Sequence, residues 1–539
     1  MPNFYEEDGV LYADDSIIAN FIPRVQAGYA IRAGARSLLT ASDQLLIDIR
    51  RGENRQSLLW PAGALNNLNF EKECPGCIGA NVKGHSTKRL VNLYVQMQIE
   101  AGVDIRPLVP YCGWQEIDGQ MRYLAGDRLV GESLNGVQTE GDMPPPYLIM
   151  PEVRSLRLAT NGTLRASEAT ELLLSELMKH PDVFLPVWAY TLFACNRSQL
   201  QKAGLPTSCI LYFLASQGYG KTTVAKRLTM IFDTSDGRMA QVADAGTTAS
   251  AMTDMLLSAR DSCVLFDDIC KSTNRSLQTN RLHTIANLVR FAANETPRYK
   301  KRGDKRLGGV CTASLVVTGE IPLETGSDVT RCLIVSIDQP LTDGSDDLRG
   351  IAAAALEGYL HWLGHHSDEE MAAAQKEYKT WKASKRRREL ERVQCNHFIM
   401  RWLLGSFLRY ALELNIITPQ AVHQVVKATD QAFTHSWNIT AKLTERAEGT
   451  KGNNLLELIV KGATSKQFPA FQHKGCLCMQ LAQLTEYIQR ETGAAVQEKE
   501  IAAELKAQGL LAMDASGKST KKINGIRFLC IPLTRLKAR

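Results

Sequence analysis

The sequence lacks the features that would assign it to a membrane, secreted or fibrous class. It has no apolar run approaching the roughly 18 residues of a membrane-spanning helix, and it has no internal repeat or low-complexity tract. Its first residues, Met1–Asp8, are acidic and lack the basic and apolar pattern of a signal peptide. With 44% apolar and 22% charged residues, the remaining composition is that of a globular protein. We therefore expect a soluble, cytoplasmic protein.

Cysteine is present, but it does not form a recognisable disulfide framework. The 13 cysteines are an odd number, and several lie inside apolar runs, among them Cys209, Cys263, Cys332 and Cys530. This pattern is typical of small buried thiols in a reducing compartment, so we expect no disulfides. The net charge of +6 is only mildly basic. Composition alone therefore does not indicate a nucleic-acid partner. Only the local distribution of charge can indicate whether the protein binds nucleic acid.

At 539 residues the chain is too long for one hydrophobic core, because cores stop growing at roughly 250–300 residues. Short alternating runs and one helical stretch, 87–101, predict an N-terminal domain of α+β type. The later alternation of apolar strands with helical segments predicts an α/β fold, with a parallel sheet between helices. We expect an N-terminal α+β domain (1–180), an α/β core (181–345), a helical lid or connector (346–450) and a winged helix-turn-helix domain (451–539).

A glycine-rich loop follows the first apolar strand of the α/β core. The run Cys209–Leu214 continues into ASQGYGKTT (215–223), and apolar residues at helical spacing come next. Strand, loop and helix in this order form a P-loop, which holds nucleotide phosphates and Mg²⁺. Ala215 replaces the first glycine of the motif, and a chance glycine turn before a helix is the alternative. The expected ATP-binding residues are Ser216, Gln217, Gly218, Tyr219, Gly220, Lys221, Thr222 and Thr223, and Thr222 is also an expected Mg²⁺ ligand.

A second apolar strand, Cys263–Phe266, ends in the paired carboxylates Asp267 and Asp268. This pattern indicates a Walker B motif, in which the first carboxylate holds Mg²⁺ and the second polarises the attacking water. Asp268 occupies the position that glutamate usually fills and is one methylene shorter, so weaker hydrolysis is one expectation. The alternative is a solvated strand end or a helix N-cap.

A third apolar strand, Ala313–Val317, is followed by the tripeptide TGE (318–320). A polar side chain between the two strands that carry the nucleotide motifs is placed to orient the hydrolytic water, and Thr318 is the candidate. Arg331 precedes a fourth apolar strand, where an arginine finger would project into a neighbouring subunit. A surface ion pair is the alternative for this arginine. The expected catalytic residues are Asp268, Thr318 and Arg331.

Two basic segments are candidates for contact with DNA. Segment 298–306 (RYKKRGDKR) carries its cations around a Gly-Asp turn, and we expect it to track phosphates without sequence preference. Segment 517–522 (GKSTKK) is expected as a turn between two strands, after helical stretches at 481–492 and 497–508, in the order of a winged helix. The alternatives are a solvated loop and a protein-docking module. The expected DNA-binding residues are Arg298, Lys300, Lys301, Arg302, Lys305, Arg306, Lys518, Lys521 and Lys522.

These motifs resemble those of the AAA+ P-loop ATPases of phages and integrative elements, a family long labelled a domain of unknown function. The family includes cassette-element helicases similar to minichromosome-maintenance helicases. The similarity is carried by 216–223, 265–269 and 317–320 with Arg331, and CGW at 112–114 adds looser support. The resemblance implies an AAA+ core with ATP and Mg²⁺ as cofactors. It also implies a ring, expected to be a homo-hexamer, that translocates on DNA and unwinds it during replication of the element.

We therefore expect an ATP-dependent DNA helicase or replication initiator of a mobile element or phage, acting on single-stranded or forked DNA. Two alternatives remain open. One is an ATPase that remodels a protein or nucleoprotein partner, including one in anti-phage defence. The other is a nucleotide-gated DNA-binding switch. Stimulation of hydrolysis by DNA favours the motor over the remodelling ATPase, and ATP binding without multiple turnovers favours the switch.

Overall fold

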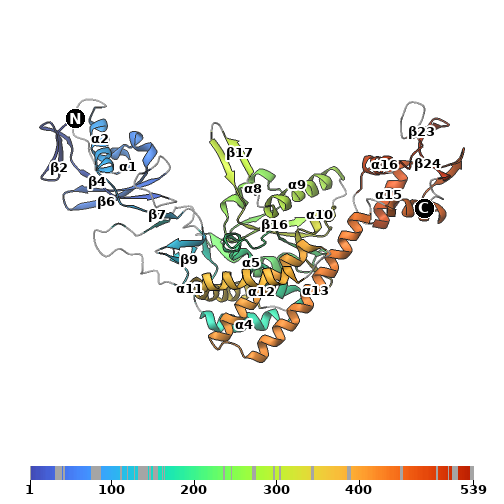
Figure 1. Cartoon of the computed structure of the whole chain (residues 1–539). Helices are drawn as coiled ribbons and strands as arrows, with labels where there is room; N and C mark the ends of the chain where they lie inside the picture. Colours follow the sequence, from blue (N-terminus) through green and yellow to red (C-terminus); the bar gives the residue numbers. More distant parts are fainter. Residues whose placement is uncertain are drawn as a thin grey trace. The chain divides into compact units, whose positions relative to one another are not determined.

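A computed structural model gives the fold of the chain (Figure 1). The chain forms two compact units, which are described separately. Unit 1 comprises Met1–Ala159, Phe232–Ala240 and Glu357–Ser367, and unit 2 comprises the remaining segments. No helix in the described part of the chain is long and apolar enough to cross a membrane. The structure describes residues 2–30, 39, 43–74, 86–109, 112–117, 119–126, 128–131, 144, 147–149, 156–160, 162, 164–234, 237–244, 246–269, 275–294, 298–302, 305–341, 345–384, 390–449, 453–492, 496–507, 509–512 and 520–534.

Unit 1 combines several small sheets with a few helices. Its elements are β1 (Phe4–Glu7), β2 (Val10–Ala13), β3 (Ser16–Ala19), β4 (Ile22–Ala30), β5 (Gln44–Arg51), β6 (Asn54–Pro61), η1 (Ala62–Asn67), α1 (Phe70–Glu73), α2 (Ser86–Glu100), β7 (Ile105–Val109), β8 (Gly113–Ile117), β9 (Gln120–Ala125), β10 (Arg128–Leu129), β11 (Leu148–Ile149), β12 (Leu156–Leu158) and β14 (Phe232–Thr234).

The largest sheet of unit 1 has the order β11-β7-β4-β5-β6. The pairs β4–β5 and β5–β6 are antiparallel, whereas β7 pairs in parallel with β4 and β11. Leu45, Ile47 and Ile49 recur at every second position of β5 and are buried in one cluster with Val91 and Val95 of α2. This period of two turns their side chains to the covered face of the sheet. The helix predicted at 87–101 is confirmed as α2.

The centre of unit 2 is a sheet of five parallel strands, β13 (Ile210–Ala215), β15 (Val242–Ala243), β16 (Cys263–Ile269), β19 (Ser314–Gly319) and β20 (Cys332–Ile337). Their order is β15-β16-β19-β13-β20, and every pairing is parallel. Because parallel strands are covered on both faces, they consist of continuous apolar runs, which is the pattern that the sequence shows. The predicted parallel sheet is therefore confirmed, with β19 between β13 and β16.

Helices α4 (Ala166–Leu177), α5 (Pro181–Cys195), α6 (Arg197–Lys202), α7 (Lys221–Leu228), α8 (Ala249–Ser258), α9 (Arg275–Ala293) and α10 (Gly326–Val329) belong to the same unit. Helix α5 is almost completely buried, and its Tyr190 hydroxyl donates to the Leu315 carbonyl at 2.8 Å. The fully buried Arg197 donates to the carbonyls of Ala313 and Ala292. These bonds satisfy polar groups that would otherwise be buried unpaired. They fix α5 and α6 to β19, the strand that carries Thr318.

Three long helices, α11 (Leu348–Ala383), α12 (Glu391–Glu413) and α13 (Pro419–Gly449), occupy the zone where the sequence predicts helix. The Trp188 ring of α5 packs edge-on against Phe407 of α12. Ser436 of α13 donates its hydroxyl hydrogen bond to the Ile334 carbonyl of β20 at 2.8 Å. Helix α12 is therefore anchored to the core through aromatic packing, and α13 through a buried hydrogen bond.

The last segment contains α14 (Asn453–Thr464), β21 (Ala470–His473), β22 (Cys476–Met479), α15 (Leu481–Thr492), α16 (Glu498–Ala507), β23 (Thr520–Ile523) and β24 (Ile526–Pro532). The helices predicted at 481–492 and 497–508 are confirmed as α15 and α16. The sheet order is β21-β22-β24-β23, so a hairpin that the sequence did not predict precedes α15. The predicted turn at 517–522 is wrong for 520–522, which lie in β23, whereas 517–519 lie outside the described residues. The turn between the last two strands is Asn524-Gly525. Both of these residues have positive φ, which Asn-Gly adopts readily in tight hairpins.

The buried His397 of α12 predicts an acid-sensitive step in stability. Burial lowers the pKa of His397 to about 3. The folded protein therefore keeps a neutral imidazole, whereas the unfolded chain takes up a proton near pH 6.5, so stability is lost as the pH falls below about 6.5, by roughly 1.4 kcal/mol per pH unit. We expect His397→Phe to reduce the fall in melting temperature between about pH 6.5 and 5 by a few degrees. His423→Phe, at an exposed position of α13, is the control, and equal slopes in all three proteins contradict the prediction.

Candidate functional site

The loop between β13 and α7 has the backbone that a phosphate-binding loop requires. Gly218 and Gly220 have φ values of 83° and 88°, in the left-handed region that glycine enters without strain. A Cβ atom on Gly218 would meet nothing within 4 Å, so conformation and not crowding calls for glycine there. The first N–H groups of a helix lack partners within it and can bind an anion. The residues before and within the first turn of α7 are Ser216, Gln217, Tyr219, Lys221, Thr222 and Thr223.

Asp267, near the end of β16, connects two of the predicted hydroxyl groups. Its Oδ1 atom accepts hydrogen bonds from Thr222 Oγ1 at 2.8 Å and from Thr318 Oγ1 at 2.6 Å. Lys226 Nζ lies 3.6 Å from Asp267 Oδ2. The three strands β16, β19 and β13 are adjacent and parallel, so their carboxyl ends meet at one edge of the sheet, where open α/β sheets bind ligands. The structure thus brings Thr222, Asp267 and Thr318 together, and we name this group the Asp267 cluster.

The two predicted carboxylates lie together in a β-bulge. The register between β16 and β19 shifts between Phe266 and Ile269, so that β16 has one extra residue. Asp268 has a φ of 68°, and its N–H donates to Thr318 Oγ1 at 2.9 Å. Thr318 therefore accepts from one aspartate and donates to the other, which uses both functions of its hydroxyl group. The Asp268 side chain is exposed, whereas Asp267 is half-buried.

Lys221 has an anionic partner that the motifs did not assign. Its Nζ atom lies 3.8 Å from Glu320 Oε1, and the two side chains are 8% and 17% exposed. Glu320 follows β19 directly, and its N–H donates to the Ile269 carbonyl at 3.0 Å. The signal that points to Glu320 is its position two residues after Thr318, at the same edge of the sheet. The sequence motifs assign Glu320 no role, yet the structure places it beside the lysine of the loop.

Arg331 stands apart from the Asp267 cluster. It lies directly before β20, and its guanidinium donates to Ser327 Oγ at 2.6 Å and to Asn294 Oδ1 at 3.2 Å. Burial and the nearby positive charge of Arg392 lower the pKa of Arg331. Neither of these contacts involves a residue of the Asp267 cluster. Within one chain, the structure therefore does not bring Arg331 to the other predicted catalytic residues.

The basic segment 298–306 lies in a hairpin of two antiparallel strands. β17 (Arg298–Arg302) and β18 (Lys305–Gly309) pair antiparallel, with Lys301 opposite Arg306 and Arg302 opposite Lys305. The ribbon extends outward beyond α8 and α9 (Figure 1). The backbone of Arg298, Lys300, Lys301, Arg302, Lys305 and Arg306 is described, whereas their side chains and the turn at 303–304 lie outside the described residues.

The basic residues of the C-terminal sheet are divided between its two faces. Lys521 and Lys522 are neighbours on β23, opposite Phe528 and Arg527 of β24. Because successive side chains of a strand point to opposite faces, the two lysines cannot both face one DNA surface directly. Lys518 lies outside the described residues. The predicted contact of this segment with DNA is therefore less concentrated than its sequence suggests.

Comparisons with known proteins show a similarity to solved structures. The sequence matches no protein-family model, and no curated protein matches it. A solved structure named "SCCmec type IV Cch - active helicase" matches with a TM-score of 0.56 at 13% identity, over 99% of this chain and 98% of that chain. Two structures of JCV helicase, one bound to an acetamide compound and one to an inhibitor, are 11% and 12% identical to this chain. Their TM-scores are only 0.20, over 53% of this chain and 73% of theirs, so they do not indicate a shared fold. The first match shows a shared fold along nearly the whole chain.

Proposed function

We propose that this protein is an ATP-dependent DNA helicase or replication initiator of a mobile genetic element or phage, with an AAA+ P-loop core and a C-terminal winged helix. The observation that carries the proposal is the convergence of Lys221 and the Asp267 cluster at one edge of a parallel sheet. The fold shared with a structure named as an active helicase supports it.

The residues at this edge fit a nucleoside triphosphate with Mg²⁺. Two left-handed glycines leave the loop backbone free to surround phosphates, and Lys221 at the start of α7 supplies a positive charge. The Thr222 hydroxyl and the Asp267 carboxylate are hard oxygen donors 2.8 Å apart, of the kind that Mg²⁺ prefers. In this proposal residues 216–223 hold the phosphates, and Thr222 and Asp267 hold the metal. Bound Mg²⁺ supplies neutralisation of phosphate charge.

The proposed catalytic roles follow from the hydrogen bonds of Thr318. This residue is fully buried and bonded to both aspartates, so it holds Asp267 toward the metal position and fixes the backbone of Asp268. The exposed Asp268 carboxylate polarises water. Arg331 makes its contacts away from its own cluster, which supports a role toward the nucleotide of a neighbouring subunit in a homo-hexameric ring.

The β17–β18 hairpin is the proposed contact with DNA. Its backbone register places Lys301 opposite Arg306 and Arg302 opposite Lys305, so basic residues are concentrated on one ribbon. Phosphate contacts of this kind are independent of sequence, as a translocating motor requires. Lys521 and Lys522 of β23 are proposed as a second, weaker contact.

We expect single-stranded DNA to stimulate ATP hydrolysis several-fold, and the double variant Lys300→Ala/Lys301→Ala to lose most of this stimulation. Removing two phosphate contacts also lowers the slope of log K against log salt by about 1.4. Lys427→Ala/Lys442→Ala removes the same charge from exposed positions of α13 and is the control. Hydrolysis by the unmodified chain that does not respond to DNA would contradict the helicase and support an ATPase that remodels a protein partner.

A further inference from the structure

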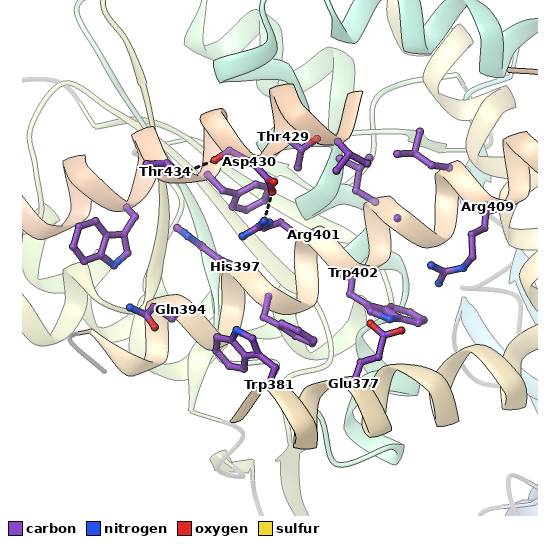
Figure 2. A pocket seen from close by; sticks show the side chains of 17 residues that line it. Glu377, Trp381, Gln394, His397, Arg401, Trp402, Arg409, Thr429, Asp430 and Thr434 are labelled. Atoms are coloured by element: carbon purple, nitrogen blue, oxygen red, sulfur yellow. Dashed lines mark hydrogen bonds and ion pairs between the residues drawn. The ribbon is translucent and has the colours of Figure 1, made fainter. Parts of the chain in front are cut away.

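A separate pocket lies among the helices that follow the α/β core. Its volume is about 700 Å³, and its walls come from the C-terminal part of α11, from α12 and from α13 (Figure 2). Ligand pockets typically have roughly 300–1,000 Å³, so a small organic group fits. The aromatic residues of its walls are Trp381, Phe398, Trp402, Phe433 and Trp437.

The walls also contain buried polar atoms with unused hydrogen-bonding capacity. Within the described residues, His397 Nε2, Trp402 Nε1 and Trp437 Nε1 are buried without a hydrogen-bond partner. His397 and Trp402 are only 6% and 7% exposed. Most buried polar side-chain atoms in folded proteins have a partner, so three such atoms around one cavity call for an explanation. A ligand with hydrogen-bonding groups on its edge would give these atoms their missing partners.

Gly405 keeps the wall of α12 open. Glycine inside a helix is less favourable than alanine by about 1 kcal/mol. A Cβ atom at Gly405 would meet only the tip of Arg409, at 3.7 Å, so close packing does not exclude a side chain there. A larger side chain would instead extend into the cavity that Gly405 lines. The glycine thus preserves the space without serving the packing of the helices.

Both arginines that line the pocket are paired with carboxylates. Arg401 pairs with Asp430, and Figure 2 shows them facing each other from α12 and α13. Arg409 pairs with Glu370 at 2.7 Å and lies over the Trp402 ring at 5.0 Å. Burial keeps His397 neutral, so that it has one donor and one acceptor nitrogen. The pocket therefore offers flat apolar faces with both donors and acceptors and has no strong preference for an ion.

We propose that this pocket binds a nucleobase, carried by a free nucleotide or by single-stranded DNA. A base is a flat ring that stacks on aromatic side chains, a contact worth about 1–3 kcal/mol per base. Its edge carries both acceptors and donors, which complement Trp402 Nε1, His397 Nε2 and the Asp430 carboxylate. This site is separate from the triphosphate site and does not depend on the proposed ATPase activity.

The test uses the full chain with Lys221→Ala, so that the proposed triphosphate site does not contribute. It is titrated with dTMP, dAMP and dGMP, and with an oligodeoxythymidylate, while tryptophan fluorescence and heat are recorded. We expect saturable binding with quenching of the indole fluorescence. Gly405→Leu, which fills the cavity, lowers the affinity at least tenfold, whereas Ala372→Leu at an exposed position of α11 leaves it unchanged.

A second variant guards against a folding defect. His397→Phe keeps a ring of similar shape but removes the hydrogen bond, and we expect an affinity at least fivefold lower at an unchanged melting temperature near neutral pH. Quenching by mononucleotides identifies the free nucleotide as the ligand, and quenching by the oligonucleotide alone identifies single-stranded DNA. Equal binding in Gly405→Leu and its control, or no saturable quenching by any probe, overturns the proposal.

Discussion

Replacing Lys221 by alanine is expected to lower ATP hydrolysis at least 100-fold and to abolish strand displacement on forked DNA. The lysine begins α7, and its charge is nearly buried beside the loop that is proposed to hold the phosphates. A positive charge in such a place stabilises the developing charge of phosphoryl transfer far more than it would in water. A loss of 100-fold corresponds to about 2.7 kcal/mol of activation free energy, which is in the range of a single well-placed donor.

The matched control for this prediction is Arg227→Ala on the same helix. Arg227 lies 3.4 Å from Asp346, a fully exposed side chain, and exposed pairs of this kind contribute about 0–1 kcal/mol. We expect this variant to hydrolyse ATP and unwind DNA like the unmodified chain. Melting temperatures of both variants show whether the fold is retained, because Lys221→Ala leaves Glu320 without its cation. Equal hydrolysis in Lys221→Ala and Arg227→Ala would contradict the proposed nucleotide site.

The parallel sheet could be predicted because each strand is a continuous apolar run with a polar residue at its end. Thr318 and Asp267 follow such runs, and parallel strands bring their ends to one edge whatever the loops between them do. Helices α15 and α16 were likewise predicted from the spacing of their apolar residues. The local sequence pattern was enough to predict these strands and helices, because their type and the positions of Asp267 and Thr318 at the strand ends depend on nearby residues.

The contacts that sequence did not predict depend on geometry between distant segments. The bulge at Asp268 arises from a register shift of one residue, which changes the surroundings of a carboxylate without changing the strand pattern. Glu320 follows β19 and Lys221 follows the loop after the neighbouring strand β13, so no local spacing encodes their pairing. The turn in the last hairpin was misplaced because a run of lysines resembles a loop, whereas Asn524-Gly525 has the backbone that a tight turn requires.

The pocket among α11, α12 and α13 could not be predicted at all from the sequence. Tryptophan and phenylalanine at helical spacing are the ordinary signal of a packed core. Whether they close on one another or surround a cavity depends on the angles at which three consecutive helices cross, which the spacing within each helix does not encode. Gly405 is a local irregularity of α12, because glycine is unfavourable inside a helix.

Asp268→Asn is expected to lower the turnover number for ATP at least 100-fold with little change in KM. The amide keeps the size of the carboxylate and the backbone bond to Thr318, but it cannot polarise water as a base. An effect confined to turnover is the mark of a group that acts in the transition state and not in binding. Steady-state hydrolysis over a range of ATP concentrations, with binding measured separately, separates the two parameters.

Glu320→Gln is the informative partner of this variant, because it removes the other carboxylate at the same edge. In the structure Glu320 lies 3.8 Å from Lys221, the lysine that the phosphates are proposed to engage. Glu320 competes with the phosphates for Lys221, so its removal is expected to lower KM for ATP several-fold, since a nearby opposite charge of this kind contributes on the order of 1 kcal/mol. The turnover number is expected to change by less than about tenfold. The reverse pattern, with turnover lost in Glu320→Gln and kept in Asp268→Asn, would assign the water-activating role to Glu320. The bulge would then serve to turn Asp268 away from the reaction, because its side chain is already exposed and its backbone is held by Thr318.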